Sequence, residues 1–143
     1  MSLPKFVHLQ CETLSLTTGK GEKLRVPFSS GLNWGQRPGR DKNQAYIAIP
    51  TNLQRSGFFP DTGIEFLMET DDGESWVCAR RQANGKAIHT VLSNSIIGSY
   101  FRRRLGLEQE EFIVVEHLLS YGRTTVDIYK ENDKKYILDF NIY

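Results

Sequence analysis

IEFLMETDDGESWVCARRQANGKAIHTVL, residues 64–92, is the stretch that decides the fold class. It contains three short runs rich in β-branched and aromatic residues, at 64–69, 75–81 and 87–92, a composition typical of β-strands. Asp72-Gly73 separates the first two runs and Asn84-Gly85 separates the last two. Such dipeptides between alternating runs are the strongest short-range signal for a hairpin. The segment therefore predicts three consecutive antiparallel strands joined by tight turns.

The same pattern continues on both sides of this segment. Further strand-like runs lie at 6–9, 12–16, 23–28, 45–49, 112–119, 124–130 and 135–140. Most are separated by Gly, Pro, Asn or Asp, the residues that favour turns. Many short strands with a turn about every 10 residues are typical of sandwiches and barrels. The chain is therefore predicted to be mainly β.

Two stretches break the alternation and predict short helices. The segment SNSIIGSYFRRRLGL, residues 93–107, predicts a helix at about 94–106 that Gly106 ends. Its apolar residues fall on one helical stripe: Ile96, Ile97, Tyr100, Phe101 and Leu105. Arg102–Arg104 lie in the last turn, where the helix dipole favours positive charge, so a structural role is expected for some of them. A shorter helical turn is predicted at 51–56, between Pro50 and Gly57.

The composition indicates a folded domain. With 143 residues, 39% apolar and 24% charged, the chain is expected to form one domain over 1–143, with Met1-Ser2-Leu3 as a cloning remnant. Its apolar runs are far shorter than the about 20 residues of a membrane helix, and no secretory signal opens it. Cys11 and Cys78 are far apart and not part of a CxxC motif, which indicates neither a disulfide nor a zinc site. We therefore expect a cytoplasmic protein without a cofactor.

The formal net charge of +1 hides a segregation of charge along the chain. Residues 20–55 and 80–104 together hold thirteen Lys and Arg against two acids, whereas the remainder holds five Lys and Arg against fifteen acids. If the two basic windows share a face, a polyanion is the expected partner. The alternative is that the charges interleave in three dimensions and form an ordinary solvated surface.

No catalytic motif accounts for these residues. His8, His89 and His117 each lie in a strand-like run without a partner at a catalytic spacing, so we expect them to be structural. The HExxH, GxSxG, Walker A and GxGxxG motifs are absent, and so is the HxK of phospholipase-D-type nucleases. A metal nuclease of the PD-(D/E)xK kind would have to recruit Asp72, Glu74 and Lys86, although no acid stands two residues before Lys86 in the same strand. We predict no catalytic and no metal-binding residues for this chain.

A nucleic-acid-binding composition is present instead. Arg pairs with guanine edges, Asn and Gln pair with adenine edges, and Lys and Arg bind phosphates. The segment GLNWGQRPGRDKNQAYI, residues 31–47, offers Asn33, Trp34, Gln36, Arg37, Arg40, Lys42, Asn43 and Gln44. The predicted hairpin offers Arg80, Arg81, Gln82, Asn84 and Lys86. Two such arms are predicted to grip one duplex; the alternative is two polar surface loops with Trp34 half-buried.

Several long strings also resemble a known family. They are LNWGQRPGRDKNQAYIAIP, FFPDTGIEFLMETDDG, RRQANGKAIHT, NSIIGSYFRRRLGL, LLSYGRTTVDIYK and YILDF. Together, over about 31–140, they resemble the C-terminal domain of NgoFVII-type restriction endonucleases. In that family a phospholipase-D-like nuclease precedes a B3-type DNA-binding domain, which is an open seven-stranded pseudobarrel with two short α-helices.

The resemblance implies a module that grips the DNA major groove with two arms, residues 31–44 and 80–86. It also implies an upstream nuclease domain in the parent protein, since no HxK is present here. The working hypothesis is sequence-specific double-stranded DNA recognition within a bacterial type II restriction endonuclease. Three alternatives stay open: a PD-(D/E)xK-like metal nuclease, a single-stranded nucleic-acid or RNA binder stacking bases on Trp34, Tyr46 or Tyr100, and a protein-interaction module.

Overall fold

The computed structural model describes residues 8–143, so the predicted remnant at 1–3 and the first half of the predicted strand at 6–9 lie outside the described residues, while residues 8–9 precede the first strand. The strands are β1 (Gln10–Ser15), β2 (Ile47–Ala48), β3 (Phe66–Thr70), β4 (Ser75–Arg81), β5 (Ala87–Thr90), β6 (Thr125–Asn132) and β7 (Lys135–Asp139). The α-helices are α1 (Thr51–Gln54), α2 (Ile96–Leu105) and α3 (Val115–Tyr121). Three 3-10 turns are η1 (Gly21–Lys23), η2 (Gly31–Gln36) and η3 (Ala83–Gly85).

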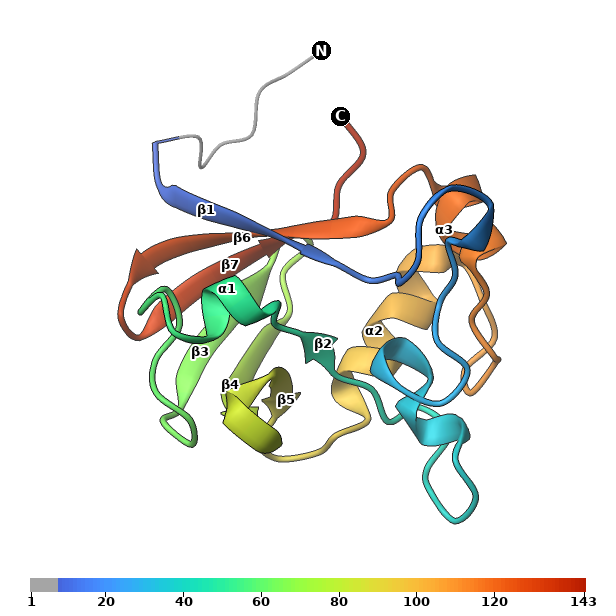
Figure 1. Ribbon diagram of the computed structural model, residues 1–143, viewed down its shortest axis with the longest axis horizontal. Coiled ribbons are helices and arrows are strands. Elements are labelled where there is room, and N and C mark those ends of the chain that lie inside the picture. Colours follow the sequence, from blue (N-terminus) through green and yellow to red (C-terminus); the bar gives the residue numbers. More distant parts are fainter. Residues whose placement is uncertain (1–7) are drawn as a thin grey trace.

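The strands form one seven-stranded sheet with the order β1-β6-β7-β3-β4-β5-β2. All neighbouring pairs are antiparallel except β3 and β7, which are parallel. The two end strands, β1 and β2, approach each other, so the sheet curls into a nearly closed pseudobarrel (Figure 1). The mainly β pseudobarrel with short helices is thus confirmed.

The β3–β4–β5 meander forms as its sequence predicts. Phe66 pairs with Cys78, and Cys78 pairs with Thr90, so the three strands are in consecutive antiparallel register. Gly73 takes a φ of +99° in the first turn, a conformation that glycine adopts without steric cost. In the second turn Asn84 and Gly85 have φ values of +60° and +64°.

The core lies between the inner face of the sheet and α2. Trp76 of β4 packs edge-on against Tyr100 of α2, with ring centroids 5.0 Å apart, and Phe101 packs in the same way against Phe140 at 5.1 Å. All four side chains are at most 2% exposed. The predicted helix at 94–106 is confirmed, and Gly106 ends it with a φ of +73°. The apolar stripe of α2 therefore fixes this helix against the barrel.

Two predicted strands are wrong. Residues 23–28 form no strand; apart from η1 they contribute only an isolated bridge between Thr18 and Arg25. Residues 112–119 contain most of α3, because Leu118 turns into the core and Gly122 ends the helix with a φ of +109°. The predicted turn at 51–56 is confirmed as α1. Within residues 8–143, no helix has the length and apolar character needed to cross a membrane.

Candidate nucleic-acid interface

The first arm (residues 31–44) and the second arm (residues 80–86) meet through a cluster of three rings. Trp34 of η2, Tyr46 beside β2 and His89 of β5 lie with their centroids 5.0–5.7 Å apart. The Tyr46 and His89 rings are stacked, with planes 13° apart, while Trp34 meets both edge-on. Figure 1 shows η2 and the β4–β5 turn on the same side of the barrel. This cluster therefore lies between the two arms, with Trp34 in the first arm and His89 shortly after the second.

Polar side chains from both arms attach to this cluster. The Arg40 guanidinium lies 4.0 Å over the Trp34 ring and donates to Gln44 Oε1 at 3.0 Å. From the second arm, Gln82 Nε2 lies 3.0 Å from His89 Nε2. Trp34 and Gln82 thus contact His89, for which a structural role was expected, and Arg40 and Gln44 join the same group through Trp34. Nothing in the local sequence distinguishes a histidine in such a ring cluster from any other histidine in a strand.

His89 is held in its neutral form. Burial lowers the pKa of its imidazole, and the positive charges of Arg81 and Arg40 lower it further, while a hydrogen bond with the Asn94 side chain opposes them. The side chain is 7% exposed. At neutral pH one ring nitrogen is therefore available as a hydrogen-bond acceptor inside the cluster.

Asn33 was predicted to contact DNA, and the structure corrects this. Its side chain is 0% exposed. Its Nδ2 donates to the carbonyls of Pro27 (2.9 Å) and Ile113 (2.8 Å), and its Oδ1 accepts from the Ile113 amide (2.9 Å). Asn33 instead fastens the first arm to the segment before α3, because its amide matches three backbone groups that would otherwise be unpaired.

Arg80 needs the same correction. Its guanidinium donates to four carbonyls, those of Gln54, Pro60, Asn84 and Gly85, at 2.7–3.2 Å. The side chain is 5% exposed. Arg80 therefore stabilises the conformation of the second arm and joins it to the end of α1. Its guanidinium is buried against these carbonyls and is not exposed to DNA.

Asn43 and Gln36 also have partners within the protein. Asn43 Oδ1 accepts from the Glu110 amide at 2.8 Å, and its Nδ2 donates to Gln109 Oε1 at 3.2 Å. Gln36 Nε2 donates to the carbonyl of Glu110 at 3.2 Å. The arm also lies close to α2, since a Cβ on Gly98 would fall 1.8 Å from the Asn43 carbonyl oxygen. Both side chains stay partly exposed, and their contact with bases stays a prediction.

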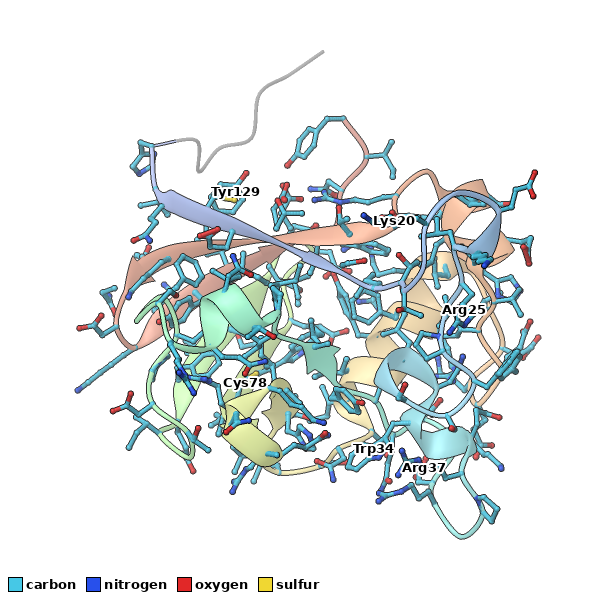
Figure 2. The ribbon with its side chains drawn as sticks, viewed as in Figure 1. Lys20, Arg25, Trp34, Arg37, Cys78 and Tyr129 are labelled. Carbon is cyan, nitrogen blue, oxygen red and sulfur yellow. The ribbon has the colours of Figure 1, made fainter. Side chains whose placement is uncertain are left out.

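The basic residues divide into two groups. On α2, Arg103 pairs with Asp72 and Glu74, Arg104 pairs with Asp71, and Arg102 is buried and donates to the carbonyls of Gly98 and Glu111. Apart from Arg80, described above, the remaining nine basic residues of the two windows form no salt bridge with any residue in 8–143: Lys20, Lys23, Arg25, Arg37, Arg40, Lys42, Arg55, Arg81 and Lys86. Figure 2 shows Arg37 beside Trp34 in the lower part of the view, with Arg25 above them and Lys20 nearer the top. At least Arg37 of these cations therefore lies next to the ring cluster.

The acids considered for a metal nuclease form hydrogen bonds and ion pairs within the protein. Asp72 accepts from the Thr70 hydroxyl and pairs with Arg103, and Glu74 accepts from the Trp76 indole at 2.9 Å. Lys86 follows the far end of β4, a seven-residue strand that spans about 20 Å. In the part of the chain that the structure describes, no group of three or more His, Cys, Asp or Glu side chains is placed to hold a metal ion. The PD-(D/E)xK set is thus not assembled.

The family model of the NgoFVII C-terminal B3-like DNA-binding domain matches residues 5–132. The chain belongs to this family. The resemblance seen in the sequence is thereby confirmed, and DNA is the partner of the B3-like domain. The solved structure of a hypothetical protein from Arabidopsis thaliana is similar over 68% of this chain and 76% of its own, with a TM-score of 0.37 and 16% identity. No curated protein matches the B3-like chain.

Proposed function

We propose that this B3-like domain recognises a specific sequence in double-stranded DNA by placing both arms in the major groove. The observation that carries the proposal is the Trp34–Tyr46–His89 cluster, in which Trp34 of the first arm packs against His89, the hydrogen-bond partner of Gln82 in the second arm. Rigidly seated donors and acceptors discriminate between base edges, whereas a mobile loop would lose entropy on binding.

The unpaired cations supply the affinity in this proposal. Exposed Lys and Arg without a carboxylate partner bind phosphates and release counterions, so binding weakens as salt rises. If about five phosphates are neutralised, the logarithm of affinity falls against the logarithm of salt concentration with a slope of about −4 to −5. Lys86→Ala should make this slope shallower by about 1, whereas Lys134→Ala, in the turn between β6 and β7, should leave it unchanged.

We further propose that the domain is the recognition module of a type II restriction endonuclease and that cleavage belongs to another domain of the parent protein. The proposal is supported by the family name and by the acids at 71–74, which pair with arginines of α2. The purified chain should therefore not nick plasmid DNA in magnesium, manganese or EDTA. Metal-dependent nicking that disappears in Asp72→Ala would favour the PD-(D/E)xK alternative.

Stacking of unpaired bases is less well supported. Trp34 and Tyr46 already pack against each other and against His89, and Tyr100 is 1% exposed. The discriminating experiment is a titration of the chain with double-stranded DNA, single-stranded DNA and RNA of one sequence at two salt concentrations. Preference for the duplex, weaker at high salt, supports the proposal. Preference for unpaired strands supports the stacking alternative, and no salt-dependent binding supports a protein-interaction module.

A further inference from the structure

The backbone of Gln82, at the start of the β4–β5 turn, has an unusual conformation. Its φ is +69° and its ψ is 177°, a region that glycine occupies and that strains a residue with a side chain. Strain of this kind persists only where the surrounding structure imposes it, and it concentrates at ligand-binding sites. The Gln82 side chain is half-buried at the edge of the ring cluster. A glutamine at a glycine position therefore points to a role for its side chain.

That side chain is held by one hydrogen bond. Gln82 Nε2 lies 3.0 Å from His89 Nε2. The amide nitrogen carries only protons to donate, so the imidazole nitrogen must accept, which requires a neutral ring. The His89 ring is fixed by stacking on Tyr46 and by the edge of Trp34. Acceptance at Nε2 places the proton of the neutral ring on Nδ1.

This arrangement fixes what the amide presents outward. One proton of Gln82 Nε2 goes to His89, and the second proton and the Oε1 atom remain, side by side, for a ligand. Adenine offers the complementary pair in the major groove, with N7 as acceptor and N6 as donor. Guanine offers two acceptors, N7 and O6, and its O6 would face the Gln82 oxygen.

We propose that Gln82 reads an adenine in the major groove and that His89 is the positioning residue that fixes the orientation of the Gln82 amide. This inference rests on the proposed function. It adds the base that is recognised, adenine, and the residue that orients Gln82, His89. Without His89, both Nε2 protons of Gln82 would be free to donate to guanine N7 and O6. With His89 as acceptor, one of these protons is taken, and the amide presents one donor and one acceptor, the pair that suits adenine.

The first test is selection of binding sites from a randomised duplex pool with wild type, Gln82→Ala and His89→Phe. Wild type should select a consensus with an adenine at a position where Gln82→Ala tolerates any base, at a loss of discrimination of about 5- to 100-fold. His89→Phe keeps a ring in the cluster but removes the acceptor, so it should accept guanine as well as adenine there. Lys134→Ala should select the wild-type consensus.

The second test uses base analogues at that adenine and needs no fold-sensitive variant. Replacement by 7-deaza-adenine removes N7, and replacement by purine removes the N6 amine. Each should weaken wild type by about 5-fold or more and leave Gln82→Ala unaffected. A wild-type consensus without such a position, or equal sensitivity of Gln82→Ala to the analogues, would overturn the inference alone. Absence of any wild-type consensus would overturn the proposed function itself. A His89→Phe protein that melts like wild type and still rejects guanine would refute the role of His89.

Discussion

Replacing Asn33 by alanine is expected to destabilise the fold and not to remove a single DNA contact. The side chain is fully buried and makes three hydrogen bonds of 2.8–2.9 Å to Pro27 and Ile113. Alanine leaves the three backbone groups without partners. At about 1 kcal/mol for each buried bond, the free energy of unfolding should fall by about 3 kcal/mol, and by more if water cannot reach the groups.

The measurement is urea denaturation followed by tryptophan fluorescence. A loss of about 3 kcal/mol should lower the urea midpoint by roughly 1.5 M, taking a slope of about 2 kcal/mol per molar. Gln36→Ala is the matched control in the same arm, because its amide is partly exposed and its bonds of 3.2–3.3 Å reach two carbonyls only. It should lose less than about 1 kcal/mol. An Asn33→Ala protein with the wild-type midpoint and altered base preference would refute this reasoning.

Three further predictions concern the second arm and His89 of the ring cluster. Arg80→Lys cannot reach all four carbonyls and should lower the free energy of unfolding by about 2 kcal/mol or more, whereas exposed Arg81→Lys should change it by less than about 0.5 kcal/mol in the same urea assay. Gln82→Gly should be more stable than Gln82→Ala by about 1 kcal/mol in thermal melts, the reverse of the usual order, because only glycine relaxes at a φ of +69°. Because the pKa of His89 is lowered in the fold, the unfolded chain takes up this proton first, so stability should fall as pH drops below about 6.5. In His89→Phe, the loss of stability between pH 7 and pH 5 should be smaller by the contribution of this histidine.

The sequence predicts features whose signals are local. The meander at 64–92 depends on two turn dipeptides and on alternation within each strand, and both are visible in short windows. The α2 helix depends on one stripe and one terminal glycine. The run at 112–119 was misassigned because β-branched residues favour strands, while its helix depends on the burial of Leu118 against the rest of the fold.

The candidate site depends on contacts that a short window does not contain. Trp34 and His89 are far apart in the chain, and only the curling of the sheet brings their rings to 5.0 Å. Asn33 and Gln36 are equally suited to base pairing by residue type, yet one lies in the core and the other at the surface. Residue types thus identified the two arms, while packing determines which side chains of each arm face outward.

Sequence-specific binding to a duplex is the central claim, and competition binding tests it most directly. The purified chain is bound to a duplex selected from a randomised pool, at physiological salt, and challenged with a scrambled duplex of the same length and composition. We predict that the scrambled duplex competes at least about 1,000-fold more weakly, the range of specific DNA-binding proteins. Equal competition by the two duplexes would contradict the claim, because it would show that the arms hold only the phosphate backbone.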